Sequence, residues 1–156
     1  MEALLAISNN GVIGKGIGLA WHLQEDLKHF RDKTLDKTVI VGTTTLMGLP
    51  VLPKRTIVQL SRGRKLSNAA DICYTPEAAF QKYPTAVVIG GAKVITSMLP
   101  YLARLIITHV NLDIPYSDDL VYFDIPPGFK VDKEYALSEM AVVREYTRRK
   151  LSAKVS

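Results

Sequence analysis

Cysteine is almost absent from this sequence of 156 residues, which contains only Cys73. A single thiol cannot form an internal disulfide, and it excludes the cysteine-rich sites that hold structural zinc. No apolar run approaches the roughly 20 residues that a membrane-spanning helix needs. The acidic second residue, with no basic segment before "ALLAI", is unlike a signal peptide. We therefore expect a cytoplasmic protein with no membrane partner.

Acidic residues are missing between residues 38 and 70, a stretch that carries five basic side chains: Lys54, Arg55, Arg62, Arg64 and Lys65. This stretch accounts for the net charge of +5 of the whole chain. Two interpretations stay open, a solvated basic surface or a site for a small polyanion such as a phosphate or carboxylate. Because interleaved aromatic residues are lacking, we expect no nucleic-acid partner.

Several familiar catalytic motifs are also lacking. The glycine-rich loop at 11–18 contains no G-x-G-x-x-G, and no helix follows it directly, which excludes the classical Rossmann fingerprint. No serine stands in a G-x-S-x-G context. The three histidines, His22, His29 and His109, do not have the spacing of metal ligands. We therefore predict no metal site and ordinary hydrogen-bonding roles for these histidines.

The hydrophobic patterning predicts one domain over residues 1–156, in which strands and helices alternate. Strands are expected at 3–7, 37–42, 55–61, near 72–74, from 85 to the glycine pair at 90–91, and at 104–112. Helices are expected from 23 to about 33, from 76 to 83 and from the glycine pair to Pro100, with a short helix or turn before Pro50. Two closing strands, 130–139 and 141–151, follow without helices. This order predicts an α/β fold with a mostly parallel central sheet, an antiparallel C-terminal edge and helices on both faces.

Asp26 occupies an unusual place in the first predicted helix. Leu23, Leu27 and Phe30 fall on one apolar face, and Asp26 lies on that same face. A carboxylate there loses hydration when the face packs, which is costly. Asp26 could simply stabilise the helix dipole, although Glu25 can already do so. Alternatively, it lies beside a pocket, where it would bind a cationic or amidine-like ligand edge and tune proton transfer.

The segment "VIGGAKV" at 88–94 places two glycines between a buried strand and a helix. Adjacent glycines allow a ligand to approach the backbone closely, and the start of the helix favours anions. A structural tight turn uses the same pair, so both interpretations stay open.

Taken together, these segments resemble the dihydrofolate reductase family over nearly the whole chain and in the family's order. The matching motifs are "AISNNGVIG" at 6–14, "LAWHLQEDLKHF" at 19–30, "GTTT" at 42–45, "LPKR" at 52–55, "LSR" at 60–62, "VIGGAKV" at 88–94 and "ITHV" at 107–110. The resemblance implies a monomer that reduces 7,8-dihydrofolate to tetrahydrofolate for one-carbon metabolism and thymidylate synthesis, and that is an antifolate target.

The resemblance also implies roles for individual residues toward the substrate. Asp26 would bind the 2-amino group and N3 side of the pterin, supported by Thr108, while Trp21 holds a water near the carboxylate and Leu19 closes over the nicotinamide. Arg55 would pair with the α-carboxylate of the substrate. The apolar wall of the pterin and benzoyl groups would be formed by Leu4, Leu5, Leu27, Phe30, Leu49, Leu52 and Ile89.

The implied cofactor is NADPH, with hydride transfer from its nicotinamide C4 to C6 of dihydrofolate and protonation at N5. A glycine pair joined by a cis peptide, Gly90–Gly91, is part of the likeness. The cofactor site would comprise Ala6, Ile13, Gly14, Gly42, Thr43, Thr44, Thr45, Leu60, Ser61, Arg62, Gly90, Gly91, Ala92, Lys93, Val94 and Ile95. Three alternative functions compete with this one: a pyrimidine or pterin reductase of the same fold, a catalytically idle binding module, and a basic nucleic-acid-binding domain. Asp26 and Arg55 together argue for a folate.

Overall fold

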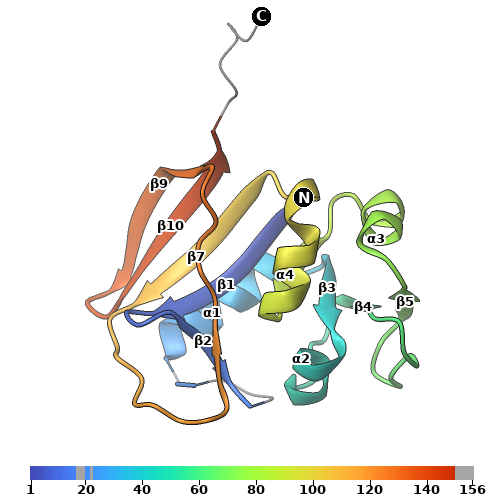
Figure 1. Ribbon diagram of the computed structural model, residues 1–156, viewed down its shortest axis with the longest axis horizontal. Helices are drawn as coiled ribbons and strands as arrows, with labels where there is room; N and C mark the ends of the chain where they lie inside the picture. The colour runs from blue at the N-terminus through green and yellow to red at the C-terminus, as the bar shows by residue number, and fades with distance from the viewer. Residues whose placement is uncertain (17–19, 22, 150–156) are drawn as a thin grey trace, which may run out of the picture.

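The computed structural model describes residues 1–16, 20, 21 and 23–149, and its main feature is an eight-stranded sheet flanked by helices (Figure 1). Across the sheet, the strands lie in the order β5 (Asp71–Cys73), β4 (Thr56–Leu60), β3 (Thr38–Gly42), β6 (Val87–Gly90), β1 (Glu2–Ser8), β7 (Arg104–Val110), β10 (Ala141–Arg148) and β9 (Phe129–Ser138). The first six strands are parallel, whereas β10 pairs antiparallel with both β7 and β9. The predicted fold class is confirmed.

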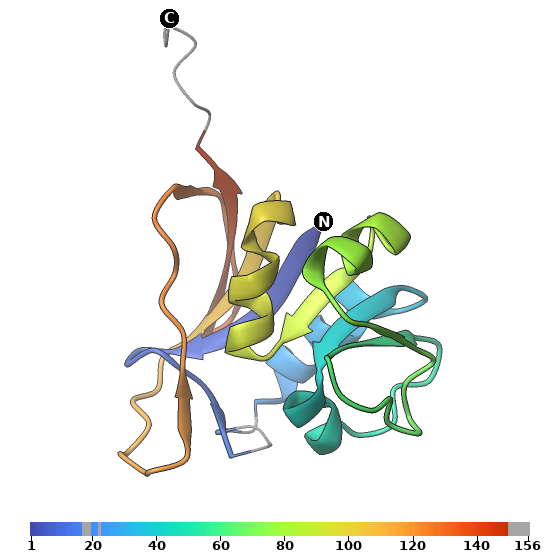
Figure 2. The same ribbon diagram turned by 45° about the vertical axis from the view of Figure 1, so that its right-hand side comes forward.

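The helices lie on both faces of this sheet. They are α1 (Gln24–Thr34), α2 (Thr43–Gly48), α3 (Pro76–Lys82) and α4 (Ala92–Met98), which continues into the short 3₁₀ helix η1 (Leu99–Tyr101). Figures 1 and 2 show α4 on one face of the sheet and α1 on the opposite face. Among the described residues, no helix has the length and apolarity that crossing a membrane requires.

Local chemistry explains where α3 begins. Pro76 occupies the first helical turn, where its missing N–H is not needed, and the Thr75 hydroxyl accepts a 3.1 Å hydrogen bond from the amide of Ala78. The predicted start of this helix is confirmed. The predicted stop at Pro100 is refined, because α4 ends at Met98 and Pro100 lies within η1.

The core is divided between the two faces because side chains alternate along each strand. Ala3, Leu5 and Ile7 of β1 pack on one face, together with Ile95 of α4. Leu4 packs on the opposite face in a separate cluster that includes Phe30 of α1. The strand β1 therefore contributes to two different environments, and only one of them borders α1.

Two short strands, β2 (Val12–Lys15) and β8 (Leu120–Tyr122), form a separate antiparallel pair. The glycine-rich segment at 11–18 is predicted as a loop, and this is wrong for residues 12–15. The partner strand is far away in the sequence, so no local pattern reveals the pairing. The pair places Gly14 opposite Val121, close to the end of β1.

The apolar face predicted for α1 does not pack as expected. Leu27 is 39% exposed, whereas the buried residues of this helix are His29 and Thr34. His29 forms a 3.0 Å hydrogen bond with the Tyr135 hydroxyl of β9, as expected of an ordinary histidine. The exposed Leu27 indicates that part of the apolar face borders open space and not the core.

Candidate active site

The Asp26 carboxylate lies half-buried in the first turn of α1, above the sheet. Burial raises the pKa of Asp26 to about 6, and side-chain hydrogen bonds from Trp21 and Thr108 offset part of that rise. Of the described carboxyl groups whose pKa departs clearly from its ordinary value, only that of Asp26 is raised. A carboxyl group that titrates close to neutral pH suits proton chemistry on a bound ligand.

The strand register brings Thr108 beneath this carboxylate. Ala6 of β1 pairs with Thr108 of β7, and Leu4 pairs with Ile106, so these four side chains share the face that α1 covers. Thr108 is buried, with 1% of its surface exposed. The sequence could suggest a partner for Asp26 only through the family likeness, because the pairing joins residues about a hundred positions apart.

Four of the residues predicted to form an apolar wall lie next to one another. Leu4, Phe30 and Ile89 belong to one hydrophobic cluster, and Ile89 also packs in a second cluster with Leu49. Ile89 therefore joins the α1 side of the wall to the segment that follows α2. Two other predicted wall residues, Leu27 and Leu52, belong to neither of these clusters.

Leu5 is the clearest departure from the predicted wall. Its side chain packs against the cluster on the opposite face of the sheet, away from Leu4 and Phe30. The reason is the two-residue period of a strand, which points consecutive side chains to opposite faces. Leu5 can border the α1 side only through its backbone. Leu19 lies outside the described residues.

A groove of about 210 Å³ lies between α2, the 49–52 segment and β4. It contains the predicted Leu49, Leu52 and Arg55, and also residues that the sequence did not single out. The complete lining is Leu46, Leu49, Pro50, Val51, Leu52, Arg55, Ile57 and Asn68. Val51 is 90% exposed, so an apolar ligand group at this rim would cover it.

The guanidinium of Arg55 is held in a fixed orientation at one end of this groove. Its Nε donates to Thr34 Oγ1 at 3.1 Å, and its terminal nitrogens donate to the carbonyls of Pro53 and Arg31, both at 2.7 Å. A guanidinium has five N–H donors, and these three bonds leave two, one on each terminal nitrogen. Two donors on different nitrogens of one guanidinium are what bidentate binding of a carboxylate requires.

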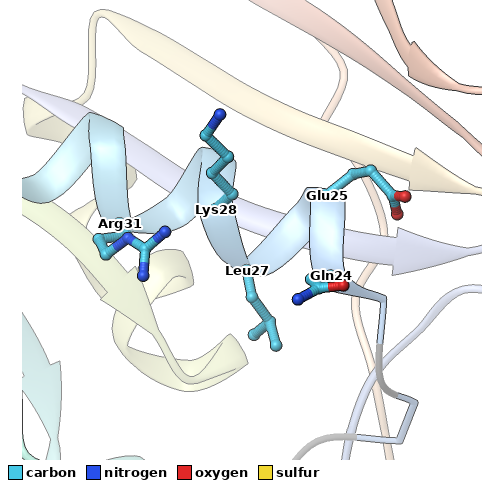
Figure 3. A pocket seen from close by; sticks show the side chains of 5 residues that line it. All are labelled: Gln24, Glu25, Leu27, Lys28 and Arg31. Atoms are coloured by element: carbon cyan, nitrogen blue, oxygen red, sulfur yellow. The ribbon is translucent and has the colours of Figure 1, made fainter.

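A second concavity of about 460 Å³ runs along α1 and is lined by Gln24, Glu25, Leu27, Lys28 and Arg31 (Figure 3). The figure shows Leu27 and Lys28 leaving the helix in opposite directions. Lys28 and Arg31 were missed at the sequence level, although Arg31 follows Leu27 by four residues, which is the spacing of neighbours on one helix face. The lining is mixed in charge, with Glu25 beside Lys28 and Arg31.

The residues predicted to bind the cofactor gather at the carboxyl ends of three parallel strands, where ligands bind in open α/β sheets. Gly42 ends β3, Leu60 ends β4 and Gly90 ends β6. The peptide bond between Gly90 and Gly91 is cis, as the family likeness implies. Two α-helices, α2 and α4, begin directly after β3 and β6 at this edge.

Close approach explains why glycine stands at two of these positions. A Cβ on Gly42 would lie 2.7 Å from Cγ2 of Val94, and a Cβ on Gly91 would lie 3.0 Å from Oγ1 of Thr45. The starts of α2 and α4 are therefore packed against each other. A side chain at either glycine would force them apart.

The predicted cofactor residues differ in accessibility. Thr44, Arg62 and Lys93 are exposed, whereas Ile95 is fully buried in the core and Leu60 is 9% exposed. The Ile95 side chain faces the core in this structure, so any contact with a ligand there falls to its backbone. The remaining predicted positions are half-buried or buried at the same edge: Ala6, Ile13, Gly14, Gly42, Thr43, Thr45, Ser61, Gly90, Gly91, Ala92 and Val94.

The basic segment, residues 61–66, follows β4 and forms hydrogen bonds of its own. Ser61 Oγ accepts from the amide of Gly63 at 2.9 Å, and Lys65 Nζ donates to the carbonyl of Ala69 at 2.6 Å. Lys65 is thus used internally. Among the described residues, the side chains of Arg62 and Arg64 have neither a hydrogen-bond nor an ion-pair partner, so they are available to an anion.

The described residues contain no group of three or more histidine, cysteine or acidic side chains that could hold a metal. His109, like His29, pairs with a tyrosine, its Nε2 lying 2.8 Å from the Tyr146 hydroxyl. The site combines one perturbed carboxyl group, one oriented guanidinium and a glycine-lined edge.

Comparison with known proteins gives a consistent result. The sequence model of a family described as "Dihydrofolate reductase" matches residues 1–136. Dihydrofolate reductase of Mycobacterium tuberculosis is 36% identical over 115 residues, which cover 70% of this chain and 71% of that enzyme. Dihydrofolate reductase type 6 of Proteus mirabilis is 28% identical over 146 residues, covering 88% and 90% of the two chains. A structure of dihydrofolate reductase from Enterococcus faecalis, complexed with NADP(H) and RAB-propyl, superposes with a TM-score of 0.78 at 26% identity and covers 96% of each chain.

Proposed function

This chain belongs to the dihydrofolate reductase family and is an NADPH-dependent enzyme that reduces dihydrofolate, and we propose that it transfers a hydride from the nicotinamide C4 of NADPH to C6 of 7,8-dihydrofolate, with protonation at N5. The product, 5,6,7,8-tetrahydrofolate, would serve one-carbon metabolism and thymidylate synthesis. The observation that carries the mechanistic proposal is the half-buried Asp26 carboxyl group, whose pKa is raised to about 6.

The residues at the carboxyl edge of the sheet fit a phosphorylated dinucleotide. Arg62 and Arg64 offer charged donors that are free among the described residues, and Thr44 offers an exposed hydroxyl. The glycines at 42 and 91 let the starts of α2 and α4 pack closely at this edge, and Gly90 leaves its backbone without a side chain of its own. NADPH supplies the hydride when bound, and the chain supplies its position.

Asp26 acts on the pterin in this proposal. Because the carboxyl group titrates near pH 6, it is mostly ionised at neutral pH and accepts hydrogen bonds from the 2-amino group and N3 side of the pterin. The negative charge favours proton uptake by the ring, and a water molecule delivers the proton to N5. Trp21 and Thr108, which bond the carboxylate, hold it in the orientation that this contact needs.

The apolar wall and Arg55 select the rest of the substrate. Phe30, Leu49 and Leu52 border the space between α1 and the groove, which suits the benzoyl ring. The two free donors of Arg55 would bind the α-carboxylate of the glutamate. An arginine that binds a carboxylate at the end of the groove favours a folate over a pterin or pyrimidine that lacks the glutamate.

The decay of NADPH absorbance upon addition of dihydrofolate tests this function. We expect turnover with wild type, a sharp loss with Asp26→Asn, and little loss with Glu25→Gln, which removes an exposed acid from the same helical turn. A truncated pterin without the glutamate should be reduced equally by wild type and Arg55→Leu. Absence of dihydrofolate-dependent NADPH decay in wild type would refute the proposal.

A further inference from the structure

Gln59 is a polar side chain in an otherwise apolar environment. It lies in β4 between Val58 and Leu60, and none of its surface is exposed. It shares its face of the strand with Ile57, which packs among Val41, Leu46 and Ala69. Burying an amide is costly unless its donors and acceptor are all bonded. The contacts of this amide show what it does.

Three hydrogen bonds satisfy the Gln59 amide. Its Nε2 donates to Thr43 Oγ1 at 2.8 Å and to the carbonyl of Arg64 at 3.1 Å, and its Oε1 accepts from the amide of Leu66 at 2.8 Å. Thr43 is the first residue of α2, while Arg64 and Leu66 belong to the basic segment that follows β4. One buried side chain thus ties the basic segment to the start of α2.

The chain between β4 and β5 contains no helix or strand. Backbone bonds hold its two ends, from the amide of Ser61 to the carbonyl of Cys73 and from the amide of Ala70 to the carbonyl of Ile57. The bonds from Gln59 hold its centre. The guanidinium groups of Arg62 and Arg64 project from the part of the segment that Gln59 anchors. Their placement relative to α2 therefore depends on this amide.

We propose that Gln59 is a positioning residue for cofactor selection: by bonding Thr43, Arg64 and Leu66, it fixes Arg62 where the guanidinium reads the 2′-phosphate of NADPH. The inference rests on the proposed function, because it assumes that the cofactor lies across this edge of the sheet. NADPH and NADH differ only in that phosphate. A loosened segment therefore weakens NADPH binding and leaves NADH binding nearly unchanged.

The geometry of the ion pair supplies the physical reason. A charge-assisted bond between guanidinium and phosphate is strong when both groups are held in place, and it weakens when one side must be ordered during binding. Without Gln59, the backbone groups of Arg64 and Leu66 lose their buried partner and the segment gains freedom. Binding of the phosphate must then restore that order.

Four variants test the proposal by titration of both cofactors and by thermal melting. Gln59→Leu removes the amide but fits an apolar cluster, and Thr43→Val removes only the hydroxyl that accepts from it. Thr43→Ser keeps that hydroxyl and is the conservative rescue. Val58→Ala, the neighbour on the opposite face of β4, is the matched control for lost core packing, since it is equally buried.

We expect Gln59→Leu and Thr43→Val each to reduce the preference for NADPH over NADH by about three- to tenfold, the range that one net hydrogen bond supplies. Thr43→Ser should retain the preference. The double variant should lose no more than the larger single loss, since both changes break one network. For Gln59→Leu, kcat at saturating NADPH should stay close to that of wild type, while Val58→Ala lowers the melting temperature without changing the preference.

An unchanged preference in Gln59→Leu and Thr43→Val, with only the melting temperature reduced, would overturn the proposal and leave Gln59 a purely structural residue. Equal weakening of NADH and NADPH, or multiplying losses in the double variant, would overturn it as well. If Gln59→Leu does not fold, Thr43→Val and Thr43→Ser decide the matter. Failure of the proposed function would show differently, as wild type that does not oxidise NADPH with dihydrofolate.

Discussion

Replacing Asp26 with asparagine is expected to stabilise the protein above neutral pH while removing most of its activity. Burial raises the pKa of this carboxyl group from its ordinary 3.8 to about 6. The contribution of this group to the stability of wild type is therefore fully present below pH 3.8 and is lost as the pH rises through about 6, where the buried group must ionise. Asparagine has the same shape and does not ionise, so it avoids that loss.

The interval between 3.8 and about 6 sets the size of the effect. At about 1.4 kcal/mol for each pKa unit, the variant should gain at most about 3 kcal/mol at pH 8 and only about 0.5 kcal/mol at pH 4. For a chain of this length, that corresponds to a rise in melting temperature of roughly 6–12 °C. Hydride transfer at pH 7.5 should fall by on the order of 10²-fold or more. Activity should partly return in acid, where the substrate is protonated beforehand.

Denaturant unfolding of both proteins at pH 4 and pH 8, together with single-turnover rates, measures these quantities. Glu25→Gln is the matched control, because it removes the neighbouring exposed acid and should give no comparable gain at pH 8. A stability difference that is the same at both pH values would refute the desolvation argument. Unchanged turnover across the pH range would refute the catalytic role.

Three other predictions follow from the groove and the glycine-lined edge. Arg55→Leu should raise the Kd for dihydrofolate on the order of tenfold or more, since a charge-assisted hydrogen bond is worth about 1.5–3 kcal/mol. The Kd for a pterin without the glutamate should stay unchanged, and an equal loss of affinity for both ligands would make Arg55 structural. Arg62→Ala should reduce the preference for NADPH over NADH more than Arg64→Ala does, as competitive titration of the two cofactors would show; equal weakening of both cofactors by Arg62→Ala would contradict it. Gly42→Ala should lower the melting temperature and weaken NADPH binding, because its Cβ would lie 2.7 Å from Val94 Cγ2, and adding Val94→Ala should recover part of both losses; no recovery would place the clash elsewhere.

The sequence was sufficient for the order of elements because their signals are local. The helix from Pro76 is specified by a proline and a threonine cap, and the parallel strands by short β-branched runs between breakers. The pair formed by β2 and β8 could not be predicted, since each strand is short and its partner lies about a hundred residues away. Pairing at that distance depends on the assembled fold.

The candidate site was predicted unevenly for the same reason. Asp26 could be predicted as a functional residue from its own helix, because helical periodicity places its carboxylate on an apolar face. The placement of Leu5 in the same wall as Leu4 could have been avoided, since consecutive side chains of a strand point to opposite faces of the sheet. Gln59 left a signal in the letters "TIVQLS", a polar residue inside a buried run. Its three partners are apparent only in the fold, where Thr43 of α2 and the segment after β4 both lie against its amide.

The orientation of Arg55 also lay beyond the sequence. The motif "LPKR" indicates an arginine, yet two of the three acceptors that fix its guanidinium, the Thr34 hydroxyl and the carbonyl of Arg31, lie in α1. No sequence pattern links α1 to the segment that contains Arg55, so these contacts could not be predicted. The chemistry of a residue was therefore readable in advance, while its geometry was not.

The most direct test of the central claim is to follow the hydride itself. The enzyme is incubated with 7,8-dihydrofolate and NADPH that carries two deuterium atoms at the nicotinamide C4, and the product is analysed by NMR and mass spectrometry. We expect tetrahydrofolate with one deuterium at C6 and hydrogen from solvent at N5. Product without deuterium, or with deuterium at another carbon, would contradict it.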